Sequence, residues 1–431
     1  MKRGSLGAAL GLAAGLQAWA QAPLLQDGSA FLRQARRTWV AGEETLPPLA
    51  IPSLEVGLGG AASDGPFTPL IAGEGLGQGA QGWGLGLQGR YFSGGWSMAL
   101  AAAVLRDGPM TQGHLLRGEI AYRWDPGWRF ALEQQPFAWG SGLTGGDLLG
   151  DAARPFPRLS LETPEFPLLA GRWRVEAFAG RLEADRPVPE WIADREARAG
   201  ARAQGMDLSR PWIYGGRLRA SFGSLVEVRL GSIRMDGGSD AHGQAAPASA
   251  ARASTLAEVT VRVPALARLA GAQGAALHLS RSAAPDSRSV TLVPARTLGS
   301  LLLVWERWDL GVEYAGGSSP DRTAVFDRPA YLAGFSSHGD SLGPAFGPWY
   351  ATRTLDLGLP LFFEGQGRLT LVRGTSALAS APSFWFLQGQ AQWRTPTGRV
   401  GASLASRRNE GPGALPRWGW TFAVFQSFRV F

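Results

Sequence analysis

Residues 83–91 read WGLGLQGRY, and this stretch decides the fold of the 431-residue chain. Its large apolar residues alternate with small or polar ones: Trp83, Leu85, Leu87 and Tyr91 against Gly84, Gly86, Gln88 and Arg90. Successive side chains of a β-strand point to opposite faces, so one face of this segment is apolar and the other is polar. That pattern is typical of a strand that separates lipid from a polar lumen.

The same period of two recurs along most of the chain. It appears at 120–132, across a Pro126-Gly127 turn, and again at 226–230, 259–263, 308–314, 355–359, 369–371, 384–393 and 400–404. A soluble β-sandwich shows this period too, but its dry core would not tolerate the arginine, glutamate and glutamine found repeatedly at inward positions. Segments of about 9–11 residues with Trp and Tyr near their ends also favour a membrane barrel. The sequence therefore predicts an all-β protein, a transmembrane antiparallel β-barrel of about 16–18 strands.

The N-terminus predicts export. Lys2 and Arg3 precede an apolar run over 6–16, and Ala18-Trp19-Ala20 supplies the small residues that a signal peptidase requires. The run is too short to cross a bilayer core of about 30 Å as a helix. We expect a cleaved signal peptide over 1–20, an N-terminal periplasmic segment over 21–50 and the barrel over 51–431. Cleavage after Ala22 and a retained N-terminal anchor are the alternatives.

Composition narrows the function classes. The chain has no cysteine, which excludes disulfides, thiol-ligated metals and thiol catalysis. Its net charge of +7 is carried by arginine, since Lys2 is the only lysine. A GC-rich coding sequence would explain why arginine replaces lysine throughout the chain. The alternative is functional: the arginine forks bind phosphates and carboxylates of lipopolysaccharide or acidic polysaccharide. We expect no nucleic-acid partner for an exported chain.

Several segments depart from the strand pattern. Residues 31–40 predict a short periplasmic helix, and residues 190–204, EWIADREARAGARAQ, predict a helix on a surface loop or in the lumen. Residues 237–251 and 280–289 lack apolar alternation and predict loops. The chain ends on Phe431, although the apolar parity of the last strand is that of Phe422, Val424, Phe428 and Val430. The barrel assembly machinery, which reads such terminal strands, is an expected partner.

Residues 139–161, WGSGLTGGDLLGDAARPFPRLSL, carry a family resemblance. The stretch is similar to the signature of the capsule assembly protein Wzi family, in which W-G-x-G and G-x-L precede a small residue and R-P-x-P. Here Trp139, Gly140 and Gly142, then Gly146 and Leu148, then 153–157 (ARPFP) match it. Weaker similarity at 174–189, 306–316 and 331–343 extends the resemblance over about 120–360, although 331–343 lacks the family's extra Tyr and Arg.

The resemblance implies an 18-stranded, monomeric barrel in the outer membrane of a Gram-negative type of cell. It also implies a role in surface attachment or assembly of capsular or extracellular polysaccharide, as a non-enzymatic lectin. Outer-membrane lipid and lipopolysaccharide would surround such a protein. The alternative from another class is a porin-like channel or transporter for anionic solutes or oligosaccharides.

The signature segment supplies the candidate binding residues. Trp139, Asp147, Asp151 and Arg154 form a set able to bind sugars, because aromatic faces pack on sugar rings while carboxylates and guanidinium groups bond hydroxyls or uronic acids. The other interpretation is structural: the glycines and prolines shape a tight turn, and Arg154 pairs with an acid in the lumen. Either way, we expect 139–157 to form an ordered turn at or inside the barrel mouth.

Catalysis is not expected. His338 and Ser341 are close in sequence, as a hydrolase would need, but no G-x-S-x-G motif surrounds them. The four histidines, at 114, 242, 278 and 338, lack metal-ligand spacing, and Asp147 and Asp151 form no calcium-loop pattern. We therefore predict no metal and no cofactor, and we place His278 on a strand facing the lumen.

Overall fold

The computed structural model describes most of the barrel wall. The described residues are 53–64, 82–107, 110–124, 127–135, 139, 143, 156–183, 197, 200, 201, 209–240, 252–285, 292–316, 336, 337, 340, 341, 350–363, 365–376, 383–410 and 418–429. The predicted signal peptide (1–20), the N-terminal segment (21–50) and its helix at 31–40 lie outside them. Those boundaries stay predictions.

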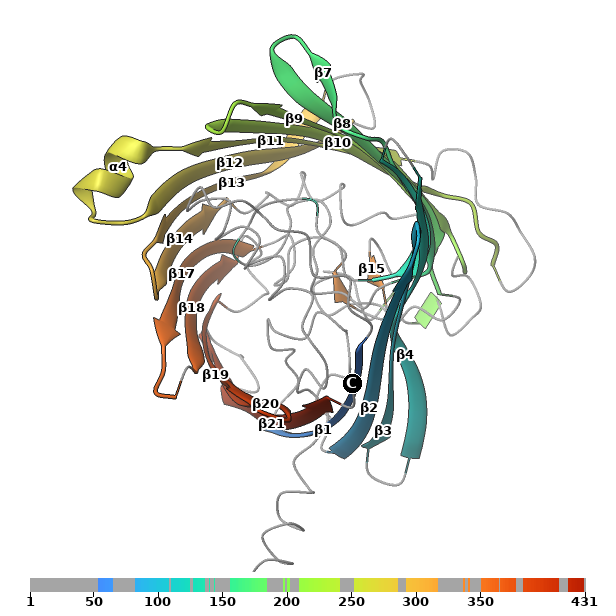
Figure 1. Cartoon of the computed structure of the whole chain (residues 1–431), viewed down its shortest axis with the longest axis vertical. Helices are drawn as coiled ribbons and strands as arrows, with labels where there is room; N and C mark the ends of the chain where they lie inside the picture. Colours follow the sequence, from blue (N-terminus) through green and yellow to red (C-terminus); the bar gives the residue numbers. More distant parts are fainter. Residues whose placement is uncertain are drawn as a thin grey trace, which may run out of the picture.

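Within the described residues, eighteen antiparallel strands close into one barrel (Figure 1). In wall order they are β1 Ser53–Asp64, β2 Gly82–Ser93, β3 Trp96–Asp107, β4 Met110–Trp124, β5 Trp128–Gln134, β6 Arg158–Glu162, β8 Gly171–Arg181, β9 Trp212–Phe222, β10 Val226–Asp236, β11 Arg252–Arg262, β12 Gly274–Pro285, β13 Leu292–Val304, β14 Asp309–Ala315, β17 Tyr350–Pro360, β18 Gln366–Ser376, β19 Ser383–Thr395, β20 Gly398–Glu410 and β21 Trp418–Arg429. The first strand pairs with both β2 and β21, which closes the ring. The predicted fold class and the strand number implied by the resemblance are confirmed.

Alternation along each strand separates an apolar outside from a polar inside. On β4, Ile120 is 48% exposed while its neighbour Ala121 is 2% exposed. Outward positions such as Leu132, Leu279 and Leu404 carry exposed apolar side chains. A continuous apolar surface of this kind indicates contact with lipid. The closed ring also satisfies the strands' backbone hydrogen bonds without leaving an edge in that lipid.

The two ends of the barrel differ in the length of their connections. At one end, β2–β3, β4–β5, β9–β10 and β19–β20 are joined by two or three residues. At the other end β3 and β4 are joined by two residues, but the long stretches 182–211 and 316–349 also connect neighbouring strands there. The predicted Pro126-Gly127 turn lies at the short-turn end, with Gly127 at φ 117°. Outer-membrane barrels place short turns in the periplasm and long loops outside the cell. We name the ends accordingly the turn end and the loop end.

Short elements complete the fold. The helix α4 Pro264–Leu269 joins β11 to β12 at the turn end; it begins with a proline, whose missing N–H costs nothing there. The strand β7 Phe166–Leu168 pairs antiparallel with the start of β8, and β15 Ser336–Ser337 pairs with β16 Asp340–Ser341. No helix among the described residues is long and apolar enough to span a bilayer.

Two segment predictions are partly resolved. Residues 280–289 were expected to form a loop, but 280–285 belong to β12, because Ser280 and Ser282 face the polar lumen while the strand pairs on both sides. The loop prediction was therefore wrong for that half. Within 190–204, the described residues Ala197, Gly200 and Ala201 are helical, as expected. The predicted aromatic ends are present, since Trp124 stacks on Trp128 with ring centroids 6.4 Å apart at the turn end.

Candidate functional site

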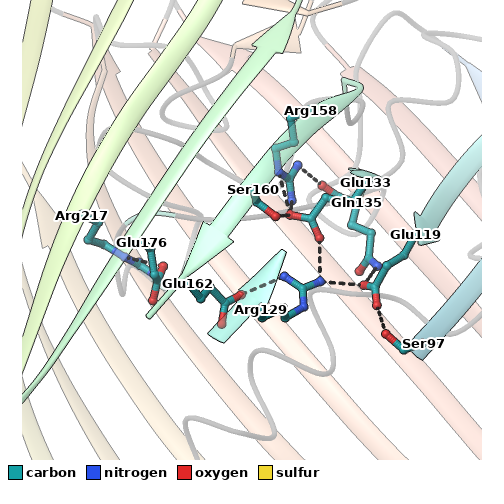
Figure 2. Close-up of polar contacts among 10 residues, drawn as sticks. All are labelled: Ser97, Glu119, Arg129, Glu133, Gln135, Arg158, Ser160, Glu162, Glu176 and Arg217. Atoms are coloured by element: carbon teal, nitrogen blue, oxygen red, sulfur yellow. Dashed lines mark hydrogen bonds and ion pairs between the residues drawn. The ribbon is translucent and has the colours of Figure 1, made fainter. Parts of the chain in front are cut away.

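Arg129 on β5 is the centre of a polar cluster on the lumen face of the wall (Figure 2). Its guanidinium nitrogens lie 3.0 Å from a carboxylate oxygen of Glu119, 3.0 Å from Glu133 and 2.9 Å from Glu162. Strand register assembles this group: Glu119 on β4 is directly opposite Glu133, and Arg129 is directly opposite Glu162 on β6. Two facing carboxylates repel each other, and the guanidinium between them offsets that repulsion.

A second arginine extends the cluster. The Arg158 guanidinium lies 3.1 Å from Glu133, and both side chains are buried. Arg158 also donates to the backbone carbonyl of Gln135 at 2.7 Å, and the Ser160 hydroxyl donates to Glu133 at 2.7 Å. All the residues in these contacts belong to β5 or β6, except Gln135, which directly follows β5. These contacts therefore link β5 to β6 at the point where the chain leaves the wall.

The pattern of paired charges continues around the wall. Further lumen-facing ion pairs are Arg217 with Glu176 at 3.1 Å and Arg219 with Glu227 at 2.8 Å. Beside them, the His278 ring lies 3.7 Å from the Glu258 carboxylate and 2.9 Å from the Thr260 hydroxyl. His278 is buried on β12, so its predicted place on a lumen-facing strand is confirmed. We call the whole set, from β4 to β12, the charge ladder. Because its described arginines are matched by protein carboxylates, the ladder presents little unneutralised positive charge to an anion, and removing one partner of a pair would leave a charge unpaired.

Trp139 leaves β5 and packs on the inner wall at β8–β10. It is 1% exposed, its ring centroid lies 5.3 Å from that of Phe178 in an edge-on arrangement, and the Arg217 guanidinium carbon lies 5.5 Å from its ring. Two glycines make room for the indole: a Cβ on Gly215 or Gly231 would lie 3.1 or 3.2 Å from it. Trp139 is thus an anchor for the segment that follows β5.

Leu143 takes the same segment to β14. Its backbone N–H donates a hydrogen bond to the Glu313 carboxylate, and its side chain fills the space above Gly311, where a Cβ would lie 2.7 Å from Leu143 Cδ1. The wall order places β14 far around the ring from β5, and Figure 1 shows β14 across the lumen from β4. The described residues Gln135, Trp139 and Leu143, which we call the crossing segment, therefore contact strands from β5 to β14 on the inside of the wall.

The far end of the signature is also fixed inside the barrel. Phe156 is buried, and its ring occupies the space over Gly180 on β8, where a Cβ would lie 2.7 Å from Phe156 Cε2. The Arg181 N–H donates to the Pro157 carbonyl at 3.3 Å. The residues between these ends lie outside the described residues apart from Leu143, so the predicted ordered turn stays a prediction. Of the predicted binding residues, only Trp139 is described; Asp147, Asp151 and Arg154 lie outside the described residues.

The contacts of the crossing segment with β8–β10 and β14 could not be predicted from the sequence. Alternation puts Glu119, Glu133 and Glu313 on the lumen face, but it does not say which strand lies opposite. Gly311 and Gly231 gave a weak signal, because glycine in a strand marks close approach of another group. For catalysis, His338 lies outside the described residues, and Ser341 is placed on β16. Among the described residues no group of three or more His, Cys, Asp or Glu could hold a metal ion.

Comparison with known proteins establishes the fold. No protein-family model matches the chain, and no curated protein sequence matches it. One solved structure, Wzi of Escherichia coli, is an outer-membrane protein involved in group 1 capsule assembly and a carbohydrate-binding β-barrel. It is 17% identical, with 86% of this chain and 84% of that chain covered and a TM-score of 0.62.

Other barrels align over similar lengths. OpdO of Pseudomonas aeruginosa is 12% identical over 88% of this chain and 97% of its own, with a TM-score of 0.51. OccAB2 of Acinetobacter baumannii is 8% identical over 88% and 98%, also with a TM-score of 0.51. The expected resemblance to the Wzi barrel is confirmed for the fold, and at these identities the likeness extends no further.

Proposed function

We propose that this chain is an outer-membrane barrel that attaches or assembles capsular or other extracellular polysaccharide at the cell surface, as a non-enzymatic lectin. The observation that carries the proposal is the crossing segment, held at β8–β10 by Trp139 and at β14 by Leu143. Two residues of one segment that contact separate strands inside the wall suit a barrel that holds a ligand at its mouth better than one that passes solutes. The likeness in fold to a carbohydrate-binding barrel supports the same proposal.

The proposed ligand contacts lie between two fixed points of the chain. Leu143 and Phe156 are both anchored, and Asp147, Asp151 and Arg154 lie between them in the sequence. Anchoring both ends lowers the entropy that the intervening chain loses when it binds a ligand. The carboxylates would bond sugar hydroxyls, and the arginine fork would bond the carboxylate of an acidic sugar.

In this proposal Trp139 does not stack on a sugar ring, which is the role expected of it from the sequence. Its ring is covered by Phe178 and Arg217, so it meets protein rather than solvent. We propose that it contributes to binding by positioning the polar residues that follow it. Stacking of Trp139 on a sugar would require the indole to leave its pocket.

The second candidate is a channel for anionic solutes or oligosaccharides. An 18-stranded wall encloses a lumen wide enough for water, which favours it. The pairing of lumen-facing arginines with glutamates disfavours it, because neutralised arginines attract anions weakly. Conductance in a planar bilayer separates the two candidates: a plugged barrel gives little steady current, and an open channel gives a stable one.

A deletion strain tests the proposal in cells that make extracellular polysaccharide. We expect less polysaccharide bound to the cells and more released into the medium than in the parent. Complementation with Arg268→Ala, a change of an exposed arginine on α4 at the turn end, should restore the bound fraction, whereas Arg154→Ala should restore it poorly. An unchanged partition between cells and medium in the deletion strain would contradict the proposal.

A further inference from the structure

Six side chains form one continuous row around the outside of the barrel. They are Tyr314, Arg353, Arg373, Trp385, Arg408 and Trp418, on β14 and β17–β21, and each stands directly opposite the next in the strand register. These six strands are neighbours in the wall, coloured orange to dark red in Figure 1. We call this set the arginine row. Directly opposite residues have Cβ atoms about 4.5–5.5 Å apart, so the row is a single surface.

The arginine row marks the edge of the apolar belt. Its aromatic members are strongly exposed, up to 61% for Trp418. The next outward row toward the turn end is Val312, Leu355, Leu371, Leu387, Ser406 and Trp420, and the one after it is Leu310, Leu357, Leu369, Gly389, Leu404 and Phe422. Lipid-facing residues thus begin one step below the arginines. Tyr and Trp at such an edge lie at the level of lipid headgroups.

The row lies at the loop end of every strand that carries it. Arg353 is near the start of β17, which follows a long connection, and Arg408 is near the end of β20. Loop ends of such barrels face the outer leaflet. At the turn end of the same wall, the corresponding row of Trp393, Val400 and Gln426 is uncharged. Among the outward-facing residues of these six strands, arginine therefore occurs only near the loop end.

Two arginines of the row lie beside aromatic rings, which orient their guanidinium groups. The guanidinium carbon of Arg373 lies 4.9 Å from the ring of Trp385, and that of Arg408 lies 5.5 Å from the ring of Trp418. An aromatic face orients the guanidinium while leaving its N–H edge able to bond an anion. Glu410 pairs with Arg373, so the row retains an excess of positive charge. With strands about 4.8 Å apart, the three arginines extend over about 14 Å.

We propose that the arginine row binds the phosphate groups of lipopolysaccharide in the outer leaflet. Phosphate is the anion of lipid headgroups, and the guanidinium fork bonds phosphate oxygens two at a time. A lipid is favoured over a lumen ligand because the row faces away from the lumen and borders the apolar belt that acyl chains would cover. This site is separate from the proposed polysaccharide contacts and does not depend on them.

Binding of purified protein in detergent to bis-phosphorylated lipid A tests the site. Replacing Arg353, Arg373 and Arg408 together with Gln should weaken binding about fivefold per arginine, or about a hundredfold in all. Arg281→Gln is the matched control, because Arg281 is an exposed, outward arginine near the loop end of β12 but outside the row. It should leave the affinity within about twofold, since its loss removes only a general surface charge. Dephosphorylated lipid A should bind the unchanged protein as weakly as the triple variant binds lipid A.

The proposal is wrong if the triple variant binds lipid A like the parent, or if Arg281→Gln weakens binding equally. It is also wrong if inorganic phosphate binds as tightly as lipid A, since the site would then recognise a free anion. A heat-dependent shift in gel mobility checks that each variant forms the barrel. Should the triple variant fail that check, Arg353→Gln alone decides: Arg353 is exposed and forms no ion pair with a described residue, and its loss should cost about fivefold in affinity.

Discussion

The backbone N–H of Leu143 donates a hydrogen bond to the carboxylate of Glu313, and this contact joins the chain that follows β5 to the distant strand β14. Leu143 follows β5, whereas Glu313 projects into the lumen from β14. The Leu143 side chain packs into the space above Gly311, two residues before Glu313. The Glu313 carboxylate and the space left by Gly311, both on β14, thus hold Leu143, which belongs to the segment that follows β5.

Removing the acceptor should release the crossing segment. We expect Glu313→Ala to increase the steady conductance of the barrel in a planar bilayer severalfold, because the Leu143 N–H loses its charged partner and the segment can leave the lumen. The control is Glu165→Ala, which removes an exposed glutamate at the turn end that pairs with Arg174. Equal currents for the two variants would show that this hydrogen bond does not restrict the lumen.

Truncating the anchor should cost stability. Trp139→Ala removes a fully buried indole, and we expect the free energy of unfolding to fall by about 3–5 kcal/mol. Trp139→Phe should lose less, since a smaller ring still contacts Phe178. Urea unfolding in lipid vesicles measures both changes. A loss below about 1 kcal/mol for Trp139→Ala would mean that the wall does not depend on this anchor.

The charge ladder should be sensitive at Arg129. Arg129→Met leaves Glu119, Glu133 and Glu162 close together without the guanidinium between them, and we expect a loss of about 3–5 kcal/mol in the free energy of unfolding. Arg174→Met, which breaks a more exposed pair with Glu165, should cost about 0–1 kcal/mol. Similar unfolding midpoints for the two variants would contradict the role given to Arg129.

Orientation in the membrane can be tested by labelling. The chain has no cysteine, so a single introduced thiol reports its own position. Thr375→Cys, at an exposed position near the loop end of β18, should react with a membrane-impermeant maleimide on intact cells. Ser224→Cys, exposed in the β9–β10 turn, should react only after the cells are permeabilised. The reverse pattern would invert the barrel, and would place the arginine row in the inner leaflet.

The fold could be predicted because its signal is local. Alternation at Trp83 to Tyr91 or Val226 to Leu230 depends only on neighbouring residues, and it gives both the strand and the face that meets lipid. The boundaries between strands and loops were harder to predict: Ser280 and Ser282 were expected in a loop but lie on β12. A serine that faces a polar lumen looks like a serine in a loop, because neither is buried among apolar side chains.

The candidate site could be predicted only in part, because its contacts are distant in sequence. The signature at 139–157 was selected by resemblance, and Trp139 and Phe156 are indeed buried in the barrel. No local pattern shows that Trp139 packs against Gly215 and Gly231, or that the Leu143 N–H bonds Glu313. Those contacts depend on the closure of the ring, which sets the strands that face one another. The arginine row likewise appears only once the register of six strands is known.

Binding of the purified barrel to immobilised acidic polysaccharide tests the central claim most directly. The account predicts saturable binding by the unchanged protein, at least tenfold weaker binding by Arg154→Ala, and unchanged binding by the turn-end variant Arg268→Ala, with all three proteins showing the same heat-dependent gel shift. A loss of about 1.4 kcal/mol or more fits one charge-assisted contact to a sugar carboxylate. Absence of binding by the unchanged protein, together with a stable open-channel current in a bilayer, would contradict the account and favour a channel.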